Sequence, residues 1–493
     1  MRARRRTAAQ QLGLEQVQRE IKATDPHGRL KYLREFSEAF REYQWVLSGA
    51  ELQQRLKRAN VLLVGDYHAL PACQNYTADL LEQLTLDGRP VVLALEMVFS
   101  KDQHLLDRWL REEQSDDELR SALRYDLEWG YEWKPFLELL RRARRHASGV
   151  YGIDCATRGN MRKIHKRDRH AAAQIAAIRR AHPEARVVVL FGEAHLAPTH
   201  LPACLRLLRP KDRVLTVLQN VDELYWRSAG ESLDALPAVQ VSEDVVCVFN
   251  ATPLEKYERY RICIEQWRQP EPEVAHAALA PTFYNLVDTL LRSLGLEQYY
   301  PVAGSHPSTL VEEYPDVQRR SETGQFEALL AEYDVAPTER RAVLERLRRN
   351  GCVYLPQKNL LLIERFNMAA AAEEAVRFVQ TECRGARSLL GPWAAASPEH
   401  HFYFGVMEKA LVTFGARVLN PHAPAAADEK QAGSLERLGI SLGAAMHEAY
   451  VDGLLTRSHL RALFFRKIHL PGAAKKAYFE VAKRIAAQRA VKN

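Results

Sequence analysis

Six short runs of apolar, largely β-branched residues recur in the first half of this 493-residue chain. They are Val61–Val64, Val91–Leu95, Val150–Ile153, Val187–Phe191, Val214–Leu218 and Val245–Phe249. Longer amphipathic stretches such as Tyr76–Leu86 and Met161–Arg180 separate them. Continuous apolar strands that alternate with helical segments are typical of a parallel sheet covered by helices on both faces. The pattern therefore predicts an α/β domain with a mainly parallel sheet flanked by helices.

The length of the chain indicates more than one domain, because single hydrophobic cores stop growing near ~250–300 residues. The segment before the first apolar run is polar and helical in pattern. After about residue 250 the strand pattern fades, and amphipathic helices such as Phe283–Leu294 and Thr338–Arg349 follow. We expect an N-terminal helical segment (1–54), an α/β domain (55–255) and an all-helical C-terminal domain (256–493).

Composition excludes several classes of protein. The 69 Lys and Arg residues exceed the 62 Asp and Glu residues by only seven, so the charge gives no strong nucleic-acid signal. The seven cysteines include no C-x-x-C pair, which argues against a disulfide framework or a zinc ribbon. No apolar run approaches the ~20 residues of a membrane span, and no secretory signal is evident, so we expect a cytoplasmic protein.

Two predicted helices carry clustered arginines. One holds Arg141, Arg142, Arg144 and Arg145, and the other holds Arg340, Arg341, Arg346, Arg348 and Arg349. Acidic residues neighbour both clusters in the sequence. We interpret both as solvated helix faces, with a phosphate or nucleic-acid contact as the alternative.

Ionisable residues follow four of the six apolar runs. Gly65-Asp66-Tyr67-His68 and Gly192-Glu193-Ala194-His195 are two copies of one turn, while Glu96 and Asp154 follow the second and third runs. The carboxyl ends of parallel strands meet at one edge of a sheet, where open α/β sheets bind ligands. Each glycine permits a tight exit from its strand, so that the histidine can turn back over this edge.

Two imidazoles and a carboxylate at one edge suit a divalent metal ion with open coordination positions. They equally suit a metal-free acid–base pair, with a histidine as the base and a carboxylate that orients it. A single acid at a strand end is commonly a helix cap, which is the alternative for Asp66, Asp154 or Glu193. The repetition of the turn favours a functional site.

These motifs resemble ChaN-like domains, from the superfamily that joins ChaN-type haem-binding uptake proteins, Tiki and TraB proteins, and erythromycin esterases. Gly65–His68 is similar to their opening G-E-x-H, Leu95–Met97 to their L-E-M, and Gly192–His195 to their closing G-x-x-H. Arg167 and Asp168 resemble an arginine–acid element of the wider superfamily. The resemblance covers roughly residues 60–220.

The resemblance implies a metal, iron or haem centre at the carboxyl edge of the sheet. The expected metal ligands are His68, Glu96, His195, Asp66 and Glu193, with Arg167 in support, and the expected haem ligands are Tyr67, His68 and His195. Two departures weaken the haem role. Asp66 replaces the usual glutamate, and Ala72, Cys73 and Gln74 stand where ChaN-like proteins tend to carry further histidines.

Two alternatives stay open beside a divalent-metal or haem-iron cofactor. One is a hydrolase in which metal-bound or histidine-activated water attacks an ester or amide. Its candidate catalytic residues are His68, Glu96 and His195, with Arg167 steadying the oxyanion. The other is a non-catalytic scaffold whose helical domain binds a partner. The expected ligands are a small molecule, haem or a peptide.

Overall fold

The computed structural model describes residues 1–24, 31–155, 164–231, 238–268, 279–296, 298–299, 308–311, 313–320, 323–385, 397–421 and 433–492. The chain forms two compact units. One contains residues 21–263, and the other contains residues 1–20 together with residues 264–493. The first helix, α1 (Arg2–Thr24), therefore contributes most of its length to the second unit.

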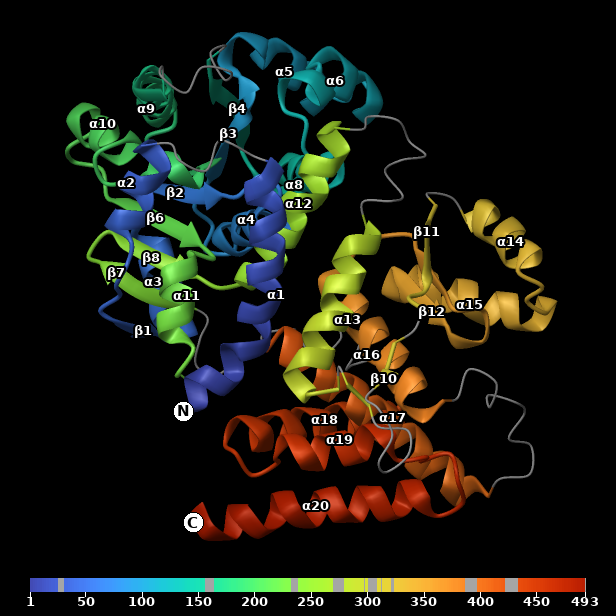
Figure 1. Ribbon diagram of the computed structural model, residues 1–493. Helices are drawn as coiled ribbons and strands as arrows, with labels where there is room; N and C mark the ends of the chain where they lie inside the picture. Colours follow the sequence, from blue (N-terminus) through green and yellow to red (C-terminus); the bar gives the residue numbers. More distant parts are fainter. Residues whose placement is uncertain are drawn as a thin grey trace. The chain divides into compact units, whose positions relative to one another are not determined.

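An eight-stranded sheet forms the centre of the unit of residues 21–263 (Figure 1). The strands lie in the order β1-β7-β8-β6-β2-β5-β3-β4, and only the β1–β7 and β7–β8 pairs are antiparallel. They are β1 (Trp45–Leu47), β2 (Val61–Asp66), β3 (Val91–Phe99), β4 (Gly149–Asp154), β5 (Arg186–Gly192), β6 (Val214–Gln219), β7 (Ala238–Ser242) and β8 (Val245–Val248). The predicted α/β fold is confirmed, and the six apolar runs form six of these strands.

Helices cover both faces of this sheet because consecutive strand side chains point to opposite faces. Leu62 and Val64 pack on the side of α3, α4 and α8, whereas Val61 and Leu63 pack on the side of α2, α9, α10 and α11. The helices of this unit are α2 (Lys31–Ala39), α3 (Gly49–Arg58), α4 (Pro71–Thr85), α5 (Gln103–Leu110), α6 (Asp116–Ala122), α7 (Tyr125–Glu128), α8 (Trp133–His146), α9 (Ile164–Ala181), α10 (Leu201–Leu208), α11 (Asp222–Ser228) and α12 (Pro253–Arg268).

The second unit was predicted to be all-helical; it is predominantly helical, but it also contains short strands. Its helices after α1 are α13 (Ala280–Leu294), α14 (Thr323–Glu332), α15 (Pro337–Asn350), α16 (Met368–Arg384), α17 (Pro398–Leu419), α18 (Ser434–Val451), α19 (Arg457–Phe465) and α20 (Ala473–Lys492). Its strands are β9 (Gln298–Tyr299), β10 (Ser308–Thr309), β11 (Asp316–Arg319), β12 (Cys352–Leu355) and β13 (Leu360–Ile363). Strands this short leave little periodicity in the sequence.

Within this second unit, helix α1 forms ion pairs with residues at the carboxyl end of α18. The Arg2 guanidinium lies 2.8 Å from the Glu448 carboxylate and 3.6 Å from Asp452. Cations at the carboxyl end of a helix are favoured by its macrodipole. Among the described residues, no helix combines the length and apolarity that a membrane crossing requires.

Strand β3 departs from regular pairing beside β4. The two strands pair regularly up to Leu95 and Gly152, and the register then shifts before Phe99 pairs with Asp154. A Cβ at Gly152 would lie 2.7 Å from Val98 Cγ1 and 2.8 Å from the Val98 carbonyl oxygen. The bulged backbone of β3 thus leaves room only for glycine at this position.

We expect Gly152→Ala to lower the free energy of unfolding by about 1–3 kcal/mol, because the added methyl group forces the packed strands apart. The measurement is the urea-unfolding midpoint, followed by tryptophan fluorescence. The control is Gly49→Ala, because a Cβ at Gly49 meets nothing within 4 Å. Equal stability of the two variants would contradict the expectation.

Candidate functional site

Four adjacent strands bring polar residues to one edge of the sheet. The four strands lie side by side in the order β2, β5, β3 and β4. Asp66 ends β2 and His68 follows it, and His195 follows the end of β5. Glu96 lies on β3, and Asp154 ends β4. Glu96 directly follows Leu95, the residue at which the regular pairing of β3 with both neighbours stops. The structure therefore gathers the predicted residues at the carboxyl edge, as the strand pattern indicates.

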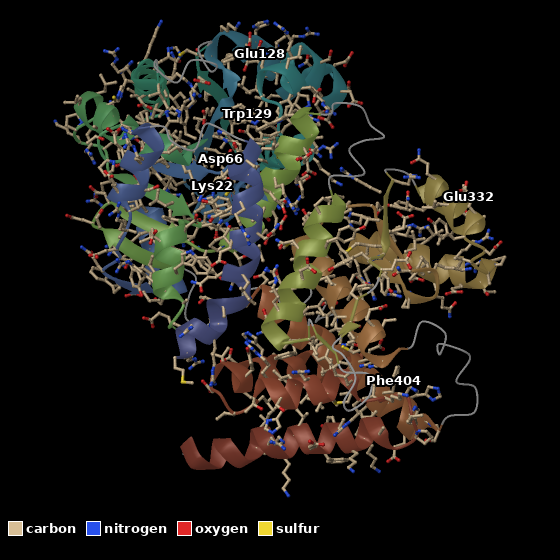
Figure 2. The ribbon with its side chains drawn as sticks, viewed as in Figure 1. Lys22, Asp66, Glu128, Trp129, Glu332 and Phe404 are labelled. Carbon is tan, nitrogen blue, oxygen red and sulfur yellow. The ribbon has the colours of Figure 1, made fainter. Side chains whose placement is uncertain are left out.

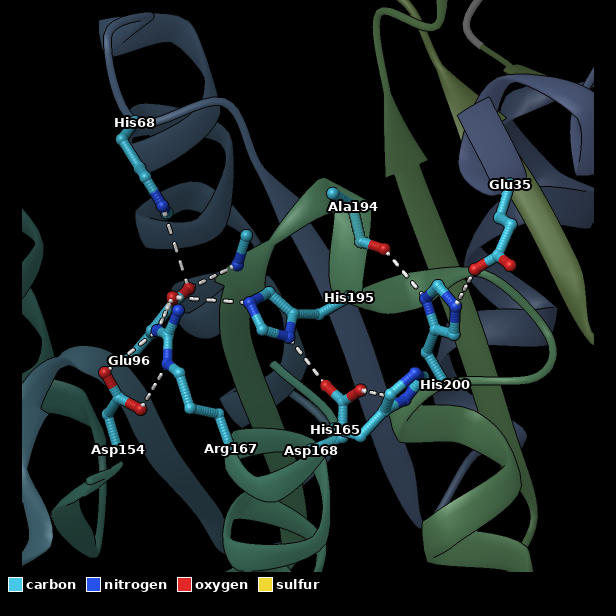
Figure 3. A network of polar contacts seen from close by, with 11 residues as sticks. Glu35, His68, Glu96, Asp154, His165, Arg167, Asp168, Ala194, His195 and His200 are labelled. Atoms are coloured by element: carbon cyan, nitrogen blue, oxygen red, sulfur yellow. Dashed lines mark hydrogen bonds and ion pairs between the residues drawn. The ribbon is translucent and has the colours of Figure 1, made fainter. Parts of the chain in front are cut away.

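A buried ion cluster surrounds Glu96 (Figure 3). Arg167, on α9, donates from Nη2 to Glu96 Oε1, and its Nε and Nη2 donate to the two carboxylate oxygens of Asp154 at 3.0 and 2.9 Å. The other Glu96 oxygen accepts the Gly192 N–H at 2.5 Å. Burial alone would raise the pKa of Glu96, but Arg167, His68 and His195 outweigh it and lower that pKa to about 2. Glu96 is thus held as a carboxylate.

His68 is oriented by a carboxylate and by aromatic rings. Its Nδ1 lies 2.8 Å from Asp66 Oδ2, and its Nε2 lies 3.8 Å from Glu96 Oε2. The ring centroid is 4.4 Å from that of Trp129 and 5.1 Å from that of Tyr131. Burial would lower the pKa of His68, but Asp66 and Glu96 overcome it and raise that pKa.

His195 repeats this arrangement from the other side of Glu96. Its Nδ1 lies 2.6 Å from Asp168 Oδ1, and its Nε2 lies 3.9 Å from Glu96 Oε1. Its side chain is 5% exposed, whereas that of His68 is 19% exposed. Each imidazole therefore has an aspartate at Nδ1 and presents Nε2 to a different oxygen of one carboxylate. Within the described part of the chain, no three His, Cys, Asp or Glu side chains are arranged to hold a metal ion.

The structure places Glu193 and Tyr67 in a neighbouring contact with Lys256 of α12. The Lys256 ammonium lies 3.0 Å from Glu193 Oε1 and 4.6 Å from the centroid of the Tyr67 ring. Burial, together with Tyr257 and Glu193, raises the pKa of Tyr67 well above its ordinary value. Glu193 and Tyr67 thus lie beside the pair of histidines, where both contact Lys256.

Sequence reasoning missed several partners of this site. Asp168 follows Arg167 in the sequence, and no contact was predicted for it. In the structure, its carboxylate orients His195. Trp129 and Lys256 carried no motif at all. Trp129 lies in the α/β unit with Asp66 (Figure 2). The sequence signal that could have suggested Trp129 and Lys256 is the amphipathic pattern of α7, α8 and α12, which indicates that these helices pack on the rest of the unit.

Comparisons with known proteins show what part of this unit is similar to. Residues 52–177 match the family model described as haem-binding uptake, Tiki superfamily, ChaN. A solved structure titled cofacial heme binding to ChaN of Campylobacter jejuni matches with 16% identity and a TM-score of 0.29, covering 35% of this chain and 86% of that one. The comparison with curated proteins gave no match. The similarity to this family therefore rests on the sequence match over residues 52–177.

We expect Arg167→Met to lower the free energy of unfolding by about 3–5 kcal/mol, because it leaves two buried carboxylates without their cation. The matched control is Arg120→Met, which removes a surface ion pair with Asp126 and should cost about 0–1 kcal/mol. Chemical denaturation at pH 7 measures both. Adding Glu96→Gln to Arg167→Met should recover part of the loss, and a loss as small as that of the control would contradict the buried cluster.

The raised pKa of His68 predicts a pH dependence. Protonation of His68 stabilises the folded state, so this contribution is fully present below the unfolded value near ~6.5 and is lost as the pH rises through the folded pKa. We expect Asp66→Asn to lower the pKa of His68, because it removes the first of the two charges that raise it. Imidazole ¹⁵N chemical shifts in a pH titration measure this, with His68→Ala to assign the signal. An unchanged titration would show that Asp66 does not act on His68.

Proposed function

We propose that this edge of the sheet binds an iron centre, as haem or as a divalent ion, through histidine nitrogens, because residues 52–177 match the ChaN family model. One observation carries the proposal: His68 and His195 each have a carboxylate at Nδ1 and direct Nε2 toward Glu96. Such carboxylate–imidazole pairs fix the ring orientation and raise the basicity of the ligating nitrogen.

The charge of the cluster favours a cation. Among the five side chains of Asp66, Glu96, Asp154, Asp168 and Arg167, the carboxylates carry four negative charges when ionised and the guanidinium carries one positive charge. Four minus one leaves three negative charges when both imidazoles are neutral, and buried charges need compensation. Protons on the imidazoles supply part of it, and a bound cation would supply more.

Haem is the form of iron that the family match favours. Haem iron needs one or two axial ligands from the protein, so it does not require a set of three side chains. His68 is the better exposed imidazole, and Trp129 and Tyr131 beside it offer aromatic surface. Tyr67 suits the role of axial ligand less well, because its raised pKa keeps the phenol protonated. Bound iron would supply a redox-active centre.

Hydrolysis of an ester or amide is the second candidate function. The observation that favours it is the Asp66–His68 pair, since a carboxylate that orients an imidazole is the arrangement of many general bases. Arg167 is committed to Glu96 and Asp154, so in this mechanism it positions Glu96 and does not contact an oxyanion.

We expect hemin added to the purified protein to give a Soret band that saturates at a fixed stoichiometry. His68→Ala should weaken binding about tenfold or more, because loss of a supporting interaction at a metal site already costs 10–100-fold. His104→Ala is the matched control, since His104 is exposed on α5. Absorbance titration measures the affinity, and elemental analysis of untagged protein measures bound metal.

The outcomes separate the alternatives. A metal ion bound at a fixed stoichiometry and lost in His68→Ala, with no Soret band, would assign a divalent ion. Turnover of p-nitrophenyl esters in the presence of a chelator, abolished by His68→Ala, would overturn the iron proposal in favour of hydrolysis. If the protein gives no Soret band, binds no metal ion and hydrolyses no ester, the remaining alternative is a non-catalytic scaffold.

A further inference from the structure

The two arginine-rich helices differ in how their charges are compensated. On α8, each of the four arginines lies within 4.0 Å of a carboxylate, in the pairs Arg141–Asp116, Arg142–Asp79, Arg144–Glu112 and Arg145–Glu138. On α15, Arg341, Arg348 and Arg349 are exposed and form no ion pair within the described residues. The α15 face therefore carries three exposed arginines outside any ion pair and one exposed glutamate, Glu345, so its net charge is positive.

Helices α14 and α15 are consecutive helices joined by a short turn, which is the connectivity of a helix-turn-helix. Only residues 333–336 join them, a length typical of this motif. The turn is well defined, because the Val335 N–H donates to the Leu330 carbonyl at 3.0 Å and Asp334 adopts a left-handed φ of 51°. Figure 2 labels Glu332, the residue at which α14 ends. Aspartate tolerates this conformation better than most residues other than glycine.

This helix pair has a hydrophobic core of its own. Both helices and the hairpin of β12 and β13 contribute to it, through Phe326, Leu329, Leu330, Val335, Val343, Leu344, Leu347, Val353, Leu355, Leu360 and Leu362. The sheet order is β11-β13-β12, with β12 and β13 antiparallel. Helix α15 thus packs on a hydrophobic core that it shares with α14, β12 and β13.

The exposed side of α15 has a helical period. Its buried residues are Val343, Leu344 and Leu347, and the opposite side exposes Thr338, Arg341, Ala342, Glu345, Arg348 and Arg349. The helix carries five arginines and two glutamates, whereas α14 carries two glutamates and no basic residue. The positive charge is therefore concentrated on the second helix, which is the one that contacts DNA in helix-turn-helix proteins.

We propose that α15 binds duplex DNA in the major groove, with Arg341, Arg348 and Arg349 contacting the DNA. The major groove of B-form DNA is about 12 Å wide and admits an α-helix, whereas that of A-form RNA is too narrow for side chains to reach the bases. This function is independent of the histidine site.

The test uses the full chain and a fluorescently labelled 25-base-pair duplex of mixed sequence, with fluorescence anisotropy at several salt concentrations. We expect a Kd of about 10⁻⁴–10⁻⁶ M at physiological salt, as for non-specific binding. The triple variant Arg341→Gln/Arg348→Gln/Arg349→Gln should bind about tenfold or more weakly. Its slope of log K against log salt should fall by about 2–3, at roughly 0.9 for each lost phosphate contact.

A matched triple variant on α8, Arg141→Gln/Arg144→Gln/Arg145→Gln, removes the same charge and should bind like the original chain. Replacing the three α15 arginines by lysine should preserve most of the affinity, which distinguishes lost contacts from a misfolded helix. Equal losses in the two glutamine triples, no binding to the duplex at 50 mM salt, or tighter binding to a duplex RNA of the same sequence would each overturn the proposal.

Discussion

The ion cluster of Arg167 with Glu96 and Asp154 is the interaction on which the candidate site depends. Arg167 comes from a helix, while the two carboxylates come from neighbouring strands, so the cluster fixes the helix to the sheet edge. Glu96 in turn stands between Nε2 of His68 and Nε2 of His195. A buried charge that loses its partner is costly, so the arrangement specifies one geometry for the whole edge.

Much of this unit could be predicted from the sequence, because buried parallel strands leave a strong signal. The six apolar runs located six strands, and parallel topology then placed His68, Glu96 and His195 at one edge. Side-chain pairing across the fold left no such signal. Nothing in the sequence distinguishes Asp168, which orients His195, from Glu193, which is bound to Lys256.

The two arginine-rich helices, α8 and α15, also differ in a way that the sequence does not reveal. In the sequence, both helices combine arginines with nearby acids and invite the same interpretation. In the structure, Glu138 of α8 itself pairs with Arg145, whereas the acids that pair with Arg141 and Arg142 come from other elements, Asp116 of α6 and Asp79 of α4. No described element supplies an equivalent to Arg341. Whether an arginine forms an ion pair depends on which residues the fold brings next to it, and composition alone does not show this.

The contact between α1 and α18 has a consequence for the order of folding. Arg2 and Glu448 are 446 residues apart, yet they lie in one compact unit. Helix α1 precedes the sheet in the chain, so the strands of residues 21–263 can assemble before the helices that follow residue 263 have been made. The contacts of α1 with Asn285 of α13 and with Glu448 of α18 can form only after residue 263 has been made. Until then, the part of α1 that belongs to the second unit lacks these partners, and unpaired segments of large chains are prone to misassembly.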